Sequence, residues 1–436
     1  MIAARKKVFS ARGGVTHLPC ALEGGKRIGF ALKGGALVHG AGAQEYKGEN
    51  GAYHLPEGCV PEALYFLRTS DTICAAAYAG GRMYVCMSDG GVLKETNIAF
   101  TSPPASVRAY DGQETLVLSD GESVCLFTAQ GLSPCAEIPP FSCAGYAYER
   151  LWVYAGGGDV QRVQFSAVMD IRDFEGGGVI DLPDGRGDIL SFTELDNVFY
   201  IFRQFGIQKL TAKGREEDFV LSDADAPAAR ICHGSICTEN GKAYFLTDRG
   251  MYSFDGSSVK PFFRDHDLQP APGENVRAAA CGGRVYLSAD FEAGRALGIF
   301  CEDEKDGFLV AEEGRALCAV RAPSGLYIVF YKEGRLYTFP SGAPGGAPAL
   351  WESAPALPFG GAEGVLEELV LAGEGNFALE AVSERGCRRI DCLLSGGAKR
   401  FRIDLRGARF VFRVHSRGEA GKVFALTAGY SDKEVL

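Results

Sequence analysis

Apolar and polar positions alternate over short stretches through most of the chain. Strand, turn, strand units with aromatic centres occupy residues 151–170, 188–210 and 242–258. A period of two indicates a strand with one buried face, and turn-forming residues between two such runs indicate a hairpin. Few windows longer than ten residues keep a helical apolar period, and the best helical candidate is a short turn at 170–174. The pattern therefore predicts an all-β fold.

The strands also recur with a longer period. The central residue of a strong strand falls every 32 to 48 residues, at Tyr84, Leu116, Trp152, Tyr200, Tyr244, Tyr286 and Tyr327. A four-stranded propeller blade with its turns needs about 40 to 50 residues. A β-sandwich would give turn signals every ~8 to 12 residues without this longer repeat. The spacing predicts a six- or seven-bladed β-propeller.

Glycine is abundant, with 58 residues in 436, and many glycines occur in pairs. Such pairs supply the positive φ angles that tight turns require. The strongest hairpin signals are the dipeptides Asp89-Gly90, Asn240-Gly241 and Asp255-Gly256. These turns predict many short hairpins.

The pattern changes near the C-terminal end. A Gly/Pro/Ala stretch at 342–348 has the composition of a linker, and alternating strands follow it. We therefore expect three regions: an N-terminal β arm or propeller-closing segment at 1–60, a β-propeller at 61–355, and a small C-terminal β-sandwich at 356–436.

Charge and cysteine content narrow the function classes. The formal net charge is -10, which argues against a general nucleic-acid binder. The 14 cysteines are spread from Cys20 to Cys392, mostly inside apolar strands such as those of Cys74 and Cys125. This distribution predicts free buried thiols in a reducing compartment. The sequence shows no signal-peptide pattern and no apolar run near the ~20 residues that cross a bilayer, so we expect no membrane span.

One loop has carboxylates at a spacing that suits a hard cation such as Ca²⁺. Asp181, Asp184 and Asp188 alternate with Gly185 and Gly187. The loop lacks the terminal bidentate Glu of a full calcium loop, and Asp-Gly turns between strands have the same sequence without a metal. We favour the turn over the metal site.

A second acidic stretch follows the second aromatic unit, 188–210. Paired carboxylates there would suit acid/base work on a sugar if they stood at the right separation. A solvated loop between blades is the favoured interpretation. The residues are Ser222, Asp223 and Asp225, with Arg215, Glu216 and Glu217 close by in sequence.

Other chemistry-bearing residues are scattered. The six histidines form no metal-binding or triad pattern; they are His17, His39, His54, His233, His266 and His415. The pairs Cys232/Cys237 and Cys387/Cys392 are spaced more widely than zinc ribbons prefer, so buried thiols are expected. Phosphate-loop, nucleophile-elbow and dinucleotide motifs are absent. The sequence predicts no catalytic, cofactor-binding or metal-binding residues, no cofactor, and a protein that is not an enzyme.

A basic row stands out in this acidic chain. Alternation places Arg400 and Arg402 on one face of a strand, with Phe401 and Ile403 on the other. A salt-bridged sandwich face or a subunit contact is favoured over nucleic-acid contact. The row comprises Lys399, Arg400, Arg402, Arg406, Arg409 and Arg413.

Several stretches resemble tailed-bacteriophage virion proteins built on a β-propeller, such as the nozzle or tail tubular protein B. They begin at Arg150, Arg162, Gly185 and Phe199, and include 241–257 and Arg400 to Phe412. The resemblance covers about 145–260 and 350–430, and its motifs are structural. It implies a virion structural role, assembly in the bacterial host cytoplasm, and no site residues.

Three functions follow as hypotheses. The first is a ring-forming structural component of a phage tail or tail-like particle, with other tail or connector proteins as partners, a homo-oligomeric ring, and DNA only passing through a lumen. The second is a glycan-binding or host-recognition propeller module, because propeller faces concentrate loops at one end. A general interaction scaffold is the third.

Overall fold

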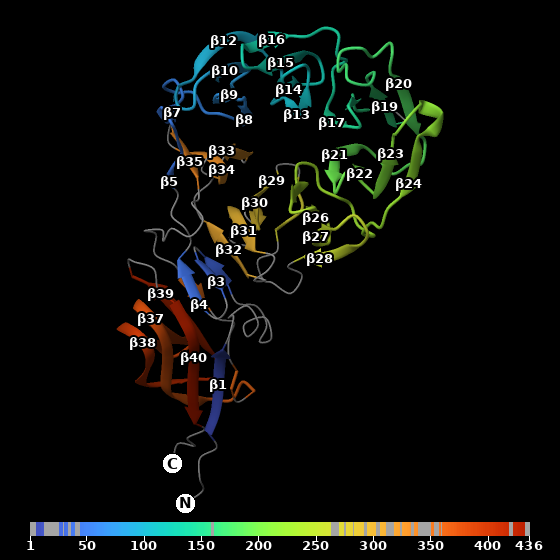
Figure 1. The fold of residues 1–436 in the computed structure, drawn as a ribbon. Coiled ribbons are helices and arrows are strands. Elements are labelled where there is room, and N and C mark those ends of the chain that lie inside the picture. The colour runs from blue at the N-terminus through green and yellow to red at the C-terminus, as the bar shows by residue number, and fades with distance from the viewer. Residues whose placement is uncertain are drawn as a thin grey trace, which may run out of the picture.

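The fold is all-β, as predicted. The computed structural model describes residues 6–12, 26–28, 30–33, 36–39, 44–157, 161–262, 360–417 and 422–431, with shorter stretches between 270 and 358. Among these residues the one helix is a single 3-10 turn, η1 (Glu216–Asp218). Figure 1 shows a ring of small sheets with a second β domain below it. No described helix has the length and apolar character needed to cross a membrane.

The predicted helical turn at 170–174 is wrong. These residues form bends, because side chains compete for the backbone donors that a helix would use. Asp170 accepts the backbone N–H of Arg172 at 3.0 Å, and Asp173 accepts that of Gly176 at 2.7 Å.

Six four-stranded antiparallel sheets follow one another along the chain. The first blade consists of β8 (Ala63–Arg68), β9 (Ile73–Ala79), β10 (Arg82–Cys86) and β12 (Lys94–Ala99). The second consists of β13 (Ala105–Tyr110), β14 (Glu114–Ser119), β15 (Val124–Thr128) and β16 (Gly131–Pro134). The third consists of β17 (Cys143–Ala147), β18 (Arg150–Tyr154), β19 (Gln161–Phe165) and β20 (Gly178–Leu182).

The next three blades repeat this order. The fourth consists of β21 (Ile189–Leu195), β22 (Val198–Arg203), β23 (Gly206–Thr211) and β24 (Val220–Asp223). The fifth consists of β25 (Cys237–Glu239), β26 (Lys242–Thr247), β27 (Gly250–Phe254) and β28 (Val259–Phe262). The sixth consists of β29 (Arg277–Cys281), β30 (Arg284–Phe291), β31 (Gly294–Cys301) and β32 (Asp306–Val310).

The seventh blade is built from both ends of the propeller sequence. β33 (Cys318–Ala322), β34 (Gly325–Lys332) and β35 (Arg335–Thr338) are completed by the N-terminal strands β5 (Gln44–Glu45), β6 (Lys47–Gly48) and β7 (Gly51–His54) and by β11 (Gly91–Val92). Its β33 contacts β29 of the sixth blade and β8 of the first, so seven blades close the ring.

The hydrophobic core is divided among the spaces between consecutive blades, because one blade cannot bury its own face. Trp152 and Phe165 of the third blade pack with Phe199 of the fourth. In the closing contact, Tyr53 meets Phe66 of the first blade edge to face, with ring centroids 5.8 Å apart.

The residues that mark the sequence repeat lie on equivalent strands in all blades but the first. Leu116, Trp152, Tyr200, Tyr244, Tyr286 and Tyr327 all lie on the second strand of a sheet, which is flanked by strands on both sides. Tyr84 lies instead on β10, the third strand of its sheet. The second strand there, β9, is mostly alanine, which explains why the first interval is short.

Two of the predicted turns differ in outcome. Asn240 and Gly241 have φ values of 49° and 72° and join β25 to β26 in a tight hairpin, as predicted. The hairpin predicted at Asp89-Gly90 is wrong, because the following β11 pairs in parallel with β7. Buried Asp89 instead accepts a hydrogen bond from the Tyr53 hydroxyl at 2.9 Å.

The C-terminal domain is a β-sandwich formed by one hydrogen-bonded sheet around a single core. Its strands are β36 (Leu350–Glu352), β37 (Gly364–Ser383), β38 (Gly386–Gly407), β39 (Phe410–Ser416) and β40 (Lys422–Ser431), joined by the N-terminal strands β1 (Lys6–Arg12) and β2 (Lys26–Ile28). Strands within 1–60 therefore pair with both domains, and the 342–348 stretch lies outside the described residues.

The long β37–β38 hairpin folds over near its middle. Gly373 pairs with Gly397, and the register shifts next to them, where Gly396 has a φ of 87°. One half of β37 pairs with β40 and the other half with β39. This bend lets both halves cover the same core. The short strands β3 (Phe30–Lys33) and β4 (Ala36–His39) contact β32 and β40, so they join the two domains.

Candidate functional site

The 181–188 loop surrounds a buried guanidinium rather than an open oxygen cage. Arg203, at the end of β22, is fully buried. Its Nε and Nη2 donate to the carbonyl oxygen of Gly187 at 2.9 and 2.8 Å, and its Nη1 donates to Asp184 Oδ1 at 2.9 Å. The same Nη1 also donates to Gln208 Oε1 at 3.1 Å.

The second oxygen of Asp184 is also occupied. Gln208 Nε2 donates to Asp184 Oδ2 at 2.9 Å, and Arg186 Nε lies 3.3 Å from the same oxygen. Two guanidinium groups thus balance one carboxylate. We call Asp184, Arg186, Arg203 and Gln208 the Arg203 cluster, and its contacts match the turn interpretation of this loop.

The other two carboxylates of the loop have separate partners. Arg162 donates to Asp181 at 2.8 and 3.2 Å. Asp188 accepts from the Tyr154 hydroxyl at 2.9 Å and from Gln204 at 3.3 Å. Burial and the Asp188 carboxylate raise the pKa of Tyr154 to about 12. Among the described side chains, no group of three or more potential ligands is placed to hold a metal ion.

The acidic stretch around β24 also divides into structural contacts. Asp223 accepts from Arg186 Nη2 at 2.7 Å, and this hydrogen bond lowers the pKa of Asp223. Asp225 accepts the backbone N–H of Val259 in the next blade at 2.7 Å. Arg215 and Glu217 form an exposed ion pair at 3.6 Å. The two candidate carboxylates thus bind different partners, which matches a loop that ties blades together.

The described histidines lie in different parts of the fold. His54 is on β7 and His233 is beside the propeller channel, while His415 on β39 has its Nε2 3.4 Å from Glu380 Oε2. His17 and His266 lie outside the described residues, as does the side chain of His39. No two histidines are brought together in the part of the chain that the structure describes.

The cysteines follow the sequence interpretation except at Cys387, where the expected buried thiol is exposed, and at Cys232 and Cys237, which are half-buried. The ten described thiols are free, and Cys74, Cys86 and Cys125 are buried as predicted. Cys232 and Cys237 pack against the core between the fifth and sixth blades. Burial raises the pKa of Cys237 to about 12 and also raises that of Cys392. Cys387 is the exposed member of its pair.

The basic row forms the salt-bridged face that the alternation favours. Arg400 and Arg402 are exposed, whereas Ile403 is buried. Arg400 lies 3.5 Å from Glu368, Arg402 lies 2.6 Å from Asp404, and Arg413 lies 3.8 Å from Glu380. Neighbouring carboxylates therefore offset much of the positive charge of this row.

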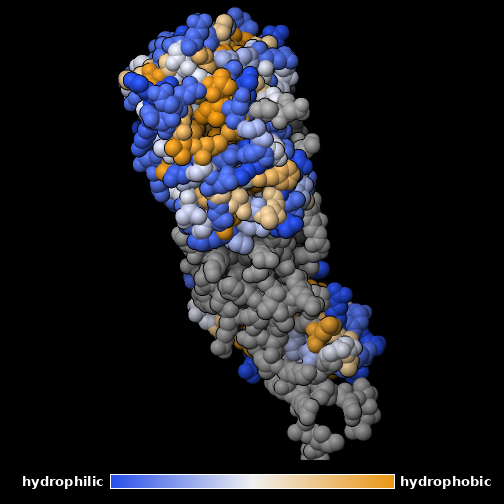
Figure 2. Space-filling model, turned by 90° about the vertical axis from the view of Figure 1, so that its right-hand side faces the viewer, coloured by the Kyte–Doolittle hydropathy of each residue, from blue (hydrophilic) through white to orange (hydrophobic). Residues whose placement is uncertain are grey.

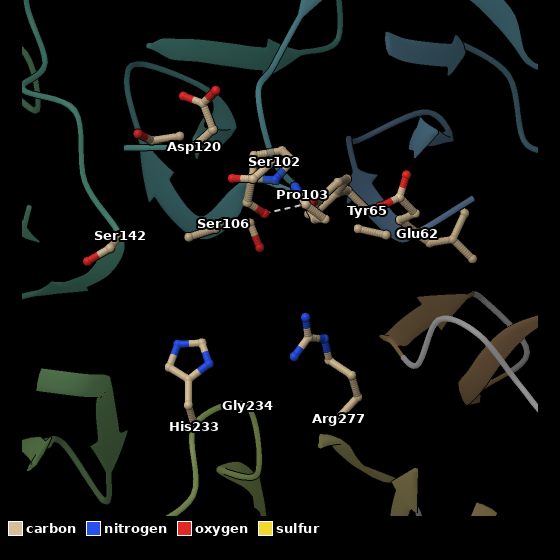
Figure 3. A pocket seen from close by; sticks show the side chains of 15 residues that line it. Glu62, Tyr65, Ser102, Pro103, Ser106, Asp120, Ser142, His233, Gly234 and Arg277 are labelled. Atoms are coloured by element: carbon tan, nitrogen blue, oxygen red, sulfur yellow. Dashed lines mark hydrogen bonds between the residues drawn. The ribbon is translucent and has the colours of Figure 1, made fainter. Parts of the chain in front are cut away.

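A cavity of about 470 Å³ opens at the face where the inner strands of the propeller begin. We call it the channel mouth. Glu62 precedes β8, Ser142 precedes β17, and Arg277 begins β29, so different blades contribute to one space. Figure 3 shows His233 and Arg277 on one wall, facing Ser106 and Tyr65 on the opposite wall.

The charged groups of the channel mouth differ in how many hydrogen bonds they make within the protein. Asp120 accepts the backbone N–H groups of Thr101, Glu122 and Ser123 at 2.7 to 3.0 Å. Burial raises the pKa of Asp120, but these hydrogen bonds outweigh it and lower the pKa below its ordinary value. Arg277 makes no ion pair with any described residue, and its Nη1 donates to the carbonyl oxygen of Val276 at 3.0 Å.

His233 stands beside Arg277 in this wall. Partial desolvation in the cavity wall lowers the pKa of His233, although the residue is exposed at its surface, and the Arg277 guanidinium lowers it further. The imidazole is therefore neutral at pH 7. The channel mouth thus presents one open guanidinium, a neutral imidazole and several hydroxyls.

Sequence reasoning did not single out the channel mouth. His233 is one of six scattered histidines in the sequence, and Arg277 belongs to no motif there. The available signal was positional: Glu62, Ser142 and Arg277 each lie at the start of the first strand of a repeat, and the starts of inner strands meet at one face of a propeller. Aligning the repeats by their first strands would have grouped them.

No protein-family model matches this chain, and no curated protein matches it. Its fold is similar to that of several solved β-propeller structures. These include the extracellular domain of BT4673 from B. thetaiotaomicron (10% identity, TM-score 0.47, covering 68% of this chain and 40% of that one), BamB from Moraxella catarrhalis (11%, 0.40, 77% and 97%) and YCF48 bound to D1 peptide (12%, 0.40, 69% and 97%). The first match thus spans less than half of that chain. These are likenesses of fold alone.

Proposed function

We propose that this protein is a structural, non-enzymatic subunit of a phage tail or tail-like particle, and that it assembles into a ring. The observation that carries the proposal is the use of the candidate catalytic and metal-binding carboxylates. Asp181, Asp184 and Asp223 bind arginines, and Asp225 binds a backbone N–H. These hydrogen bonds give each carboxylate a partner within the fold, so we assign the four groups a structural use.

The connection between the two domains supports a structural role. β1 pairs with β40 along seven residue pairs, and β7 completes the seventh blade beside β35. The N-terminal segment is therefore hydrogen-bonded into both domains. Such a body resists separation of its parts, which a subunit of a tail requires.

The outer edge of the propeller supports assembly. β20 and β24 are edge strands, and Val179, Val220 and Leu221 on them are 42%, 58% and 36% exposed. Figure 2 shows the molecule from the side on which β20 and β24 lie in Figure 1. Apolar side chains lie among polar ones on this surface. Open strand edges with apolar side chains favour pairing with another chain. We assign ring contacts to this edge.

Mass photometry of the purified chain over a range of concentrations tests the proposal. We expect one closed oligomer whose population grows with concentration, and a shift to monomer when Val220→Lys and Leu221→Lys are combined. Val92→Lys, at an exposed position away from this edge, is the control. Monomers at every concentration, with or without tail components, would contradict ring formation.

A second candidate function is a glycan-binding or host-recognition module. It is favoured by one observation, the cavity at the channel mouth, where Arg277 is open to solvent. The two functions are compatible, because the channel mouth and the outer edge are different surfaces of the propeller.

A further inference from the structure

We propose that the channel mouth binds an acidic sugar, with the Arg277 guanidinium holding the sugar carboxylate and the Ser102 and Ser106 hydroxyls holding ring hydroxyls. This inference deepens the second candidate function and rests on it. It is independent of ring assembly, because none of these residues lies on β20 or β24.

Arg277 is held in place while most of its donors stay open. Its Nη1 donates to the carbonyl oxygen of Val276, and Gly234 lies against it. Gly234 has a φ of 73°, and a Cβ there would come within 2.9 Å of Arg277 Nη1 and 2.4 Å of the Val276 oxygen. A guanidinium carries five N–H donors in a planar fork that matches a carboxylate. This single hydrogen bond leaves other donors of Arg277 for such a ligand.

The opposite wall supplies neutral donors and acceptors. Ser102 and Ser106 are exposed to the cavity, and their hydroxyls make no hydrogen bond with a described residue. Ser142 Oγ donates to the carbonyl oxygen of Tyr154 at 3.1 Å, so it remains an acceptor. Hydroxyls distributed over several blades suit a ligand that itself carries several hydroxyl groups.

The carboxylates in the wall distinguish a sugar acid from phosphate. Glu62 Oε1 accepts the backbone N–H of Gly80 at 3.2 Å, which leaves its other oxygen to accept a sugar hydroxyl. Asp120 is held charged by its backbone partners. These two negative charges disfavour a doubly charged phosphate more than a ligand with one carboxylate on a neutral ring. The volume of about 470 Å³ is within the range of small-molecule pockets.

Isothermal titration calorimetry with D-glucuronate tests the assignment. D-glucose is the matched neutral probe, and inorganic phosphate is the simple anion. We expect glucuronate to bind, glucose to bind at least tenfold more weakly, and phosphate to compete poorly. Arg277→Gln should weaken glucuronate binding at least tenfold, and Ser106→Ala should weaken it by a smaller factor. Arg68→Gln, an exposed arginine at the other end of β8, should leave binding unchanged.

Each alternative result overturns the assignment. Absence of glucuronate binding removes the acidic sugar, and phosphate binding as tight as glucuronate reduces the site to a simple anion site. Equal binding by the parent and Arg277→Gln removes the role of Arg277. Mass photometry of Arg277→Gln separates this proposal from assembly, because the variant should form the same oligomer as the parent whatever the sugar result.

Discussion

The Arg203 cluster and the channel mouth use similar groups in opposite ways. Both combine an arginine with nearby carboxylates. In the fourth blade, Arg203 is fully buried and donates to Asp184, Gln208 and the Gly187 carbonyl. In the channel mouth, the carboxylates of Glu62 and Asp120 accept backbone N–H groups instead, and Arg277 remains open. Arg203 is therefore a structural group, whereas Arg277 is available to a ligand.

This difference predicts that removing each arginine lowers the free energy of unfolding by a different amount. Arg203→Ala leaves Asp184 and Gln208 without their buried partner, and we expect a loss of about 3 kcal/mol in the free energy of unfolding. Arg277→Ala should change it far less, because the side chain is exposed. Chemical denaturation of both variants checks this order. Equal losses in the free energy of unfolding would contradict the distinction between a structural Arg203 and an open Arg277.

Gly234→Ala tests whether the backbone at the channel mouth holds Arg277 in place. The substitution forces a residue with a Cβ to a φ of 73° and against the Val276 oxygen, at a cost of about 1 to 3 kcal/mol. Displacement of Arg277 should also abolish glucuronate binding. Gly112→Ala, at a φ of 69° with open space around it, is the control for backbone strain alone. If both variants bind glucuronate as the parent does, the contact between Gly234 and Arg277 has no role.

Asp120→Asn tests whether the wall carboxylate is structural. The pKa of Asp120 is lowered in the folded protein, so its charged form stabilises the fold at pH values above the ordinary value of 3.8. That contribution is lost as the pH falls through the folded pKa. We expect the variant to be about 1 kcal/mol less stable at pH 7 and the difference to shrink below pH 4. Thermal melts at several pH values measure it, and a difference that grows at low pH would contradict this account.

The smallest effect is expected at Arg162. Its ion pair with Asp181 belongs to the same loop as the Arg203 cluster, but the two side chains are 62% and 47% exposed. Solvent and salt screen such pairs, so Arg162→Ala should leave the melting temperature within experimental error. If Arg162→Ala lowers the melting temperature as far as Arg203→Ala does, burial does not explain the different contributions of the two ion pairs to stability.

The architecture could be predicted from the sequence because blade packing repeats. Trp152, Tyr200 and Tyr244 each fill the second strand of a blade, and large side chains recur wherever blades must meet. The first blade broke the pattern, because β9 packs through alanines and its neighbour Tyr84 gave the stronger signal. Paired strands distant in sequence, such as β11 with β7, carried no local signal at all.

The channel mouth was harder to predict for a physical reason. His233 and Arg277 are 44 positions apart, and each is an ordinary polar residue within its own loop. Packing of the fifth blade against the sixth brings them together, and ring closure places them opposite residues of the first three blades. The 181–188 loop shows the reverse case: its spacing resembled a cation site, but Arg203, which occupies it, comes from the following blade.

Negative-stain electron microscopy of the purified chain, mixed with tail components, tests the central claim most directly. We predict closed rings of this chain built into tails or tail-like particles. Persistent monomers that join no particle would contradict a structural role in a tail.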